Sequence, residues 1–356
     1  MPGRTEVHPH PAGPWLVIHE GRSFGVPPRV GAGILDGSVP AAGLTPRHRE
    51  VPEPQPARSP FRRMFRDPLW LRLPLASPAA VRRASGFLSP LAGPTGLGLA
   101  AAAGLAGYGL AWAGGWQRGW PVLHEGGLAP GLVLFLVTAV WHELGHAAAL
   151  ARQGYPPGRL GIGVMVVIPV LFVDVTPVAL LPPRGRLVVN AAGACFQLGI
   201  GGILALAAGT CEAGWLRDAS GIAAGSALAA VLWSLWPFIR SDGYWLVADL
   251  LGVGALDRPP GPQIGRRART GILIHRVTNL AFIVAAGGLV TWTAGERLGP
   301  AGPWGTAGAV LIAALVWWGA IARGVRLVGT LKRDFGTKPR GRRRPRGRVR
   351  PGSGNP

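Results

Sequence analysis

Six apolar runs, each of about 20 residues, constrain this chain more than any other feature of its sequence. They are residues 91–113, 129–151, 187–209, 219–239, 277–295 and 303–322. A helix of this length crosses the hydrocarbon core of a bilayer. The sequence therefore predicts an all-α polytopic membrane protein with about six transmembrane helices.

The composition separates a large apolar part from a basic part. Of the 356 residues, 48% are hydrophobic and 15% are charged, and the formal net charge is +21. A soluble enzyme carries about 25% charged residues, and a disordered basic protein is poor in apolar residues, so neither class fits. The two cysteines, Cys195 and Cys211, are too few for a disulfide scaffold and lack zinc-finger spacing.

The distribution of arginines predicts the orientation of the spans. With the N-terminus inside, the outer loops are residues 114–128, 210–218 and 296–302, and they contain three arginines. The short inner loops contain ten. This excess is the bias of the positive-inside rule. We therefore expect a multi-pass protein of the cell membrane with both termini on the cytoplasmic side.

The segments before the first run differ from the membrane part in composition. Residues 1–60 are rich in Pro and Gly and are predicted to be a loosely ordered cytoplasmic segment, with one candidate strand at residues 15–18. Residues 61–90 carry arginines among aromatic and aliphatic side chains. This pattern is typical of a segment that lies on an anionic membrane surface.

We expect the membrane domain at residues 91–322, with its core at 129–256. Two shorter apolar stretches lie within it: 160–175 is β-branched and predicts a strand or re-entrant hairpin, and 242–256 predicts an amphipathic helix. Residues 323–356 form a basic tail that is predicted to be disordered. With spans upstream, its charge indicates anionic lipid as the partner, and no nucleic acid is expected.

The H-E-L-G-H sequence of residues 142–146, near the end of the second run, carries the chemistry. On a helix, residues i and i+4 share one face, so His142 and His146 can bind one Zn²⁺ ion. Glu143 can accept a proton from a water molecule there. Ionisable groups near the end of a span are costly and commonly functional. This favours a zinc site over a set of interfacial polar residues.

A catalytic zinc site requires a third protein ligand. Asp242 follows the fourth run and is expected at the same cytoplasmic depth as the histidines, with a proline and a glycine nearby that let its carboxylate turn inward. Asp174 is the rival, with turn capping as its other role. His275, at the start of the fifth run, is expected at the interface and not as a ligand. We predict Asp242 and keep Asp174 as the alternative.

Together these motifs resemble the site-2-protease family of intramembrane zinc metallopeptidases. The H-E-L-G-H sequence is followed about a hundred residues later by D-G-Y-W at residues 242–245. Between them lie V-D-V-T at residues 173–176 and A-G at residues 192–193. These elements resemble the bacterial branch of peptide zinc metalloproteases. The resemblance covers residues 141–256, about a third of the chain.

The resemblance implies that His142, His146 and Asp242 hold Zn²⁺ and that Glu143 is the general base. The chain departs from the family at Trp236, where the family has Asn before Pro. If that Asn holds the scissile carbonyl, another donor is needed here. Gln197 on the third run is one candidate, although it can equally form a hydrogen bond between helices.

The sequence thus predicts a zinc-dependent intramembrane endopeptidase that acts near the cytoplasmic face. Its substrate would be a transmembrane regulator or a small ribosomal peptide, and the lack of any stretch that reads as a PDZ domain favours the peptide. The segment 160–175 can offer a strand edge to an extended substrate. The alternative is a catalytically degenerate scaffold or immunity protein that binds a peptide, with Trp236 as its support.

Overall fold

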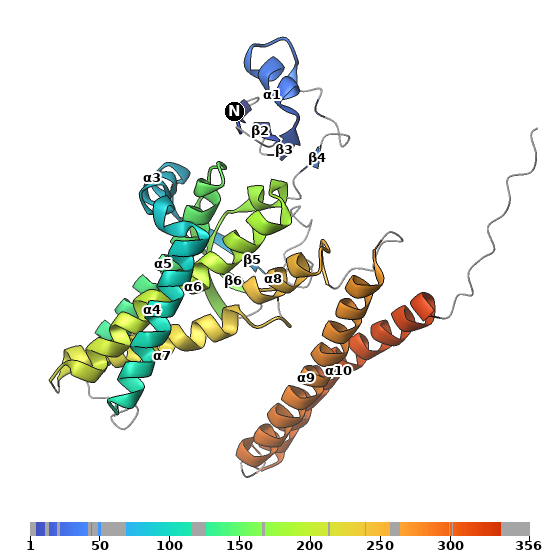
Figure 1. Ribbon diagram of the computed structural model, residues 1–356. Coiled ribbons are helices and arrows are strands. Elements are labelled where there is room, and N and C mark those ends of the chain that lie inside the picture. Colours follow the sequence, from blue (N-terminus) through green and yellow to red (C-terminus); the bar gives the residue numbers. More distant parts are fainter. Residues whose placement is uncertain are drawn as a thin grey trace, which may run out of the picture. The chain divides into compact units, whose positions relative to one another are not determined.

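The computed structural model describes residues 5–10, 14–19, 22–41, 44, 49–50, 69–115, 126–165, 168–212, 214–238, 240–256, 264–298, 300 and 302–335. The chain divides into two units, Met1–Ala255 and Leu256–Pro356, which are described separately (Figure 1). The first part of the predicted membrane-surface segment, residues 61–68, and the tail from residue 336 onward lie outside the described residues.

The first unit is built on four long helices. They are α4 (Pro94–Ala113), α5 (Leu128–Arg152), α6 (Pro183–Thr210) and α7 (Trp215–Ser234). Small residues let the backbones of α4 and α6 approach closely: a Cβ at Gly107 would lie 2.6 Å from the carbonyl oxygen of Gly202. The hydroxyl of Tyr108 donates to the carbonyl of Ala224 at 2.8 Å and so joins α4 to α7.

Four described helices are long and apolar enough to cross a membrane: α4, α5, α6 and α9 (Arg266–Leu298). They coincide with four of the six predicted spans, so the membrane-helix character of the chain is confirmed. The other two runs, 219–239 and 303–322, lie largely in α7 and α10 (Pro303–Phe335), which are helical but do not belong to this set. A total of six spans stays a prediction.

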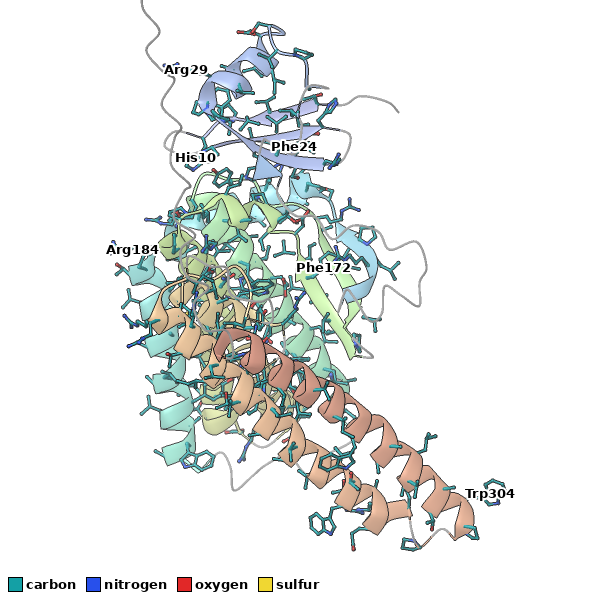
Figure 2. The ribbon with its side chains drawn as sticks, turned by 90° about the vertical axis from the view of Figure 1, so that its right-hand side faces the viewer. His10, Phe24, Arg29, Phe172, Arg184 and Trp304 are labelled. Atoms are coloured by element: carbon teal, nitrogen blue, oxygen red, sulfur yellow. The ribbon has the colours of Figure 1, made fainter. Side chains whose placement is uncertain are left out.

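A three-stranded antiparallel sheet follows the order β5-β6-β7. Strands β6 (Leu160–Met165) and β7 (Ile168–Val173) confirm the hairpin predicted in residues 160–175. Strand β5 (Leu69–Ala76) was not predicted, because its arginine among leucines suggested a surface segment. The Arg72 guanidinium of β5 lies 5.9 Å from the centre of the ring of Phe172 in β7, and Figure 2 labels Phe172 on the sheet. Helix α3 (Pro78–Leu88) follows, and its residue Val81 packs in one cluster with Ala147 of α5 and Val173 of β7.

The prediction of a loosely ordered N-terminal segment is wrong for most of the described residues before 42. Strands β1 (Thr5–His8), β2 (Trp15–His19) and β3 (Arg22–Val26) form an antiparallel sheet with the two-residue β4 (Arg49–Glu50), and α1 (Pro28–Leu35) follows β3. The strand predicted at residues 15–18 is confirmed as part of β2. Alternating apolar residues supply a small core of Val17, Phe24 and Val26. The overall composition of this segment, which is rich in Pro and Gly, does not indicate such a core.

This N-terminal sheet contacts the end of α5. That helix ends where Gly154 takes a positive φ of 87°, which glycine tolerates without strain. The next residue, Tyr155, donates its hydroxyl hydrogen to the carbonyl of Pro14 at 2.7 Å and stacks on His10 with ring centres 4.4 Å apart. Leu16 of β2 is buried in the same cluster as Leu150 and Tyr155. The sheet is therefore packed on the helix that carries the H-E-L-G-H sequence.

Two further short helices lie in the first unit. The 3₁₀ helix η4 (Thr176–Leu180) follows β7, and α8 (Asp242–Leu250) follows α7. Helix α8 confirms a helix in the stretch 242–256 but ends at Leu250, where positive φ at Gly252 turns the chain.

The second unit is the helical pair α9 and α10, which lie side by side (Figure 1). The indole of Trp317 donates to the hydroxyl of Thr291 at 3.1 Å between them. Helix α10 extends through Phe335, so residues 323–335 are helical rather than part of a disordered tail, because apolar residues recur there at helical spacing. Trp304, at the start of α10, is 89% exposed (Figure 2).

Candidate metal centre

The two histidines of the H-E-L-G-H sequence lie on one buried face of α5. The exposed fractions of His142 and His146 are 8% and 6%. Their Nε2 atoms lie 3.1 Å apart, as the i, i+4 spacing predicts for side chains that point at a common centre.

Asp242, the first residue of α8, completes a group of three. Its Oδ2 atom lies 3.0 Å from Nε2 of His142 and 3.4 Å from Nε2 of His146. The candidate ligand atoms of the three residues all lie within 4.8 Å of one another, and the group could hold a metal ion. Burial favours the neutral form of the Asp242 carboxyl, but the two imidazoles hold its pKa below the usual range.

Hydrogen bonds on the outer side of both rings turn their Nε2 lone pairs inward. Nδ1 of His146 donates to the carbonyl of Val189 at 2.7 Å, and Nδ1 of His142 donates to Oε1 of Gln197 at 2.9 Å. The Gln197 amide is oriented in turn, because its nitrogen donates to the hydroxyl of Thr138 at 3.2 Å and that hydroxyl donates to the carbonyl of Phe135 at 2.8 Å. This is the outer-shell arrangement that histidine ligands of metal ions require.

The residues present fit a metal ion. With both Nδ1 atoms acting as donors, the two Nε2 atoms and a carboxylate oxygen face one another, and a positive charge among them, either a proton on one ring or a metal ion, stabilises the set. Two imidazole nitrogens and one carboxylate oxygen are a ligand set of catalytic zinc sites. Gly193 of α6 leaves the space, since a Cβ there would lie 2.6 Å from Nε2 of His142 and closer still to that of His146.

Glu143 is attached to the sheet. Its Oε2 atom accepts a hydrogen bond from the backbone N–H of Val173 in β7 at 2.8 Å. The N–H of Val173 therefore points away from β6, although the two strands are paired. Residues two apart on a strand point the same way. The backbone polar groups of Leu171 and Pro169 thus also point away from β6. Proline has no N–H, and at this position its absence removes no hydrogen bond between β6 and β7.

The alternative ligand, Asp174, does not join the group. Its Oδ1 atom accepts hydrogen bonds from the backbone N–H and the hydroxyl of Thr176 at 3.0 and 2.6 Å. This is the turn-capping role foreseen for it. His275 lies on α9, in the second unit.

The Gln197 side chain is not available as a substitute for the family Asn, because both ends of its amide are engaged in holding His142. Gln197 instead forms hydrogen bonds between α6 and α5, which was the other role expected for it. Trp236 lies between α7 and α8, where its carbonyl accepts a hydrogen bond from the hydroxyl of Ser241 at 2.8 Å and its ring meets that of Phe238 edge to face.

The sequence did not single out Asp249 or the residues that bind it. Asp249 lies on α8 and is 9% exposed, with the guanidinium of Arg186 and the amide of Asn190 against its carboxylate. Burial raises the pKa of Asp249, whereas the Arg186 charge acts against that rise. The sequence did contain one signal for this contact: polar residues recur every three or four positions along the otherwise apolar α6.

Comparisons with protein-family models, with curated proteins and with solved structures gave no match for this chain.

Proposed function

We propose that the protein is a zinc-dependent membrane endopeptidase. One observation carries the proposal: His142 and His146 meet Asp242, a hundred residues further along the chain, in a single buried group. Glu143 is the next residue after the first of these histidines and supplies a carboxylate beside the group. The position and spacing match the zinc-peptidase signature.

The chain's own residues account for the proton transfers of peptide hydrolysis. When bound, a zinc ion supplies a Lewis acid that polarises a peptide carbonyl and makes an adjacent water more acidic. Glu143 accepts one proton from the attacking water and passes it to the leaving amine. Peptide and water thus become a carboxylic acid and an amine. The Val173 N–H donates to the Glu143 carboxylate and holds it at the edge of the sheet.

The sheet supports an extended peptide as the substrate. Strand β7 is an edge of the sheet β5-β6-β7, and the outward N–H and C=O groups of its alternate residues are those that an added strand would bond. Glu143 lies on the same edge, at Val173. A peptide that pairs along Leu171 would pass directly to the general base. A small ribosomal peptide or an unwound segment of a transmembrane regulator can both take this form.

The membrane setting of the proposal rests on the apolar helices and on the arginine distribution. The latter favours cytoplasmic termini, a site facing the cytoplasm and contact of the basic segments with anionic lipid.

The direct test is zinc content and cleavage in the purified full-length protein. Wild type should bind one zinc ion, and His146→Ala and Asp242→Ala should each lose it. Retention of zinc by Asp242→Ala, with loss in Asp174→Ala, would show that the wrong aspartate is assigned here.

A second candidate function is a peptide-binding scaffold or immunity protein. Trp236, in place of the Asn of the resembling family, favours it. A protein that binds zinc and peptide but shows no cleavage, and gains cleavage in Trp236→Asn, would support this candidate.

A further inference from the structure

One face of α6 carries a line of polar and small residues around the metal group, in addition to the Val189 carbonyl that holds His146. Arg186, Asn190, Gly193 and Gln197 are spaced by four, three and four residues, which places them along a single stripe. The second half of the stripe serves the histidines, since Gly193 makes room for them and Gln197 holds His142. The first half, Arg186 and Asn190, contacts neither histidine ring through any hydrogen bond described above.

The first half of the stripe binds α8 instead. Nε of Arg186 donates to Oδ1 of Asp249 at 2.5 Å, and the amide of Asn190 donates to Oδ2 at 2.9 Å. Both carboxylate oxygens of Asp249 are thus bonded to α6. Arg186 also donates to the carbonyl of Leu181 at 3.1 Å, which ties it to the segment before α6.

Asp249 and Asp242 lie seven residues apart on α8, which is two helical turns, so both lie on the same side of α8. Helix α8 has only nine residues, and a helix of that length is not stable alone. Its position is set by tertiary contacts. Those contacts must fix the Asp242 carboxylate to within a few tenths of an ångström, because metal–oxygen distances tolerate about 0.2 Å.

We propose that Asp249 is a positioning residue for the third metal ligand: held by Arg186 and Asn190, it fixes α8 on α6 and thereby places Asp242 opposite the two histidines. The assignment rests on the metal site proposed above. A buried ion pair contributes little net stability compared with apolar residues of the same volume, but it specifies one arrangement. Geometry of the site, more than stability of the fold, is what this pair supplies.

The test is the zinc affinity of full-length protein in detergent, measured by competition with a chromophoric chelator. Asp249→Asn should bind zinc about 10- to 100-fold more weakly, the range for residues outside the ligand shell that orient ligands. The matched control is Asp218→Asn, which removes an aspartate in the first turn of α7 and should leave the affinity unchanged.

A second variant separates positioning from general stability. The double variant Asn190→Asp with Asp249→Asn exchanges the carboxylate and the amide between α6 and α8, so Arg186 again faces one of each. It should recover most of the lost affinity. Thermal unfolding of the metal-free protein should differ little among wild type, the single variant and the double variant.

The outcomes are distinguishable. If wild type binds zinc and Asp249→Asn binds it equally well, the positioning role is overturned and the metal site stands. Weak binding that the exchange does not recover, with a lowered unfolding temperature of the metal-free protein, also overturns it, in favour of a purely structural role. If wild type binds no zinc, the proposed metal site fails, and the role of Asp249 fails with it.

Discussion

Helices α6 and α9 are both long and apolar enough to cross a membrane, but the protein uses them differently. Half of the most apolar part of α6 is buried inside the molecule, against 11% for α9. The buried face of α6 is a stripe of polar and small residues that serves the His–His–Asp group. Helix α9 packs on α10, and leucine, isoleucine, valine and tryptophan side chains are exposed along it. Hydropathy alone does not distinguish a helix that lines a site from one that packs mainly on a single neighbouring helix.

The largest expected effect comes from removing a histidine of the site. His146→Ala should lose the stoichiometric zinc and all peptide cleavage, because two ligands of this geometry no longer retain the ion. The matched variant on α9, His275→Ala, should retain both the zinc and the cleavage. Elemental analysis of the purified proteins measures the zinc directly. Loss of zinc in His275→Ala would show that α9 also contributes to the metal site, contrary to the difference between α6 and α9 described above.

The next effect separates the chemical step from metal binding. Glu143→Gln should keep its zinc and lower kcat by about 10²- to 10⁴-fold, the usual contribution of a general base. Glu296→Gln, which changes the same functional group on α9, should leave kcat unaltered. Steady-state kinetics on a peptide substrate would show this, and normal turnover by Glu143→Gln would exclude the assigned role.

A smaller effect is expected from adding one methyl group. Gly193→Ala would place a Cβ against both Nε2 atoms and should weaken zinc binding by about 10- to 100-fold. Gly288→Ala on α9 has no heavy atom within 4 Å of its added Cβ, so its zinc affinity should equal that of wild type. Equal affinities for the two variants would mean that the contact of α6 with the histidines is looser than described.

The smallest effect tests the hydrogen bond between the sheet and Glu143, which we propose as the general base. Val173→Pro removes the N–H that Glu143 accepts, at an outward position of the edge strand where proline is tolerated, as Pro169 shows. We expect kcat to fall about tenfold, the loss of one charge-assisted hydrogen bond of about 1.5 kcal/mol, with KM and zinc content little changed.

Two controls sharpen this last test. Val173→Ala keeps the N–H and removes most of the side chain, and Leu171→Pro removes an outward N–H that does not hold Glu143. Val173→Ala should keep the wild-type kcat, and Leu171→Pro should change KM more than kcat if the peptide pairs along β7. The same fall in kcat for all three variants would point to the stability of the hairpin instead.

Local patterns in the sequence were sufficient for part of this arrangement. The i, i+4 spacing of His142 and His146 fixes a shared helix face, and the β-branched composition of residues 160–175 indicates a hairpin, because both signals depend only on neighbours in the chain. The pairing of Asp242 with these histidines was expected from membrane depth. Its preference over Asp174 agrees with the structure, where Asp174 caps a turn.

Contacts between distant segments escaped prediction. Nothing near Asp249 in the sequence indicates that Arg186 and Asn190 bind it, since the choice of partner is made by helix packing. Strand β5 was missed because its strand character shows only when β6 pairs with it. Apart from the strand at residues 15–18, the N-terminal sheet was missed because the frequent Pro and Gly residues of this part of the chain suggested loose order, although the strand residues between them alternate.

The pairing of β5 with β6 has a consequence for how the chain is threaded. Ala76 lies opposite Leu160 in this pair, and the chain between them contains α4 and α5. Paired strands lie within hydrogen-bonding distance, so the segment that contains α4 and α5 begins and ends at the same place, and if both helices cross a bilayer they cross it as a pair, out and back. This condition comes from backbone hydrogen bonds alone, independently of charge. Because β5 precedes both helices in the chain and β6 follows them, β5 has no β6 to pair with until α4 and α5 have been synthesised.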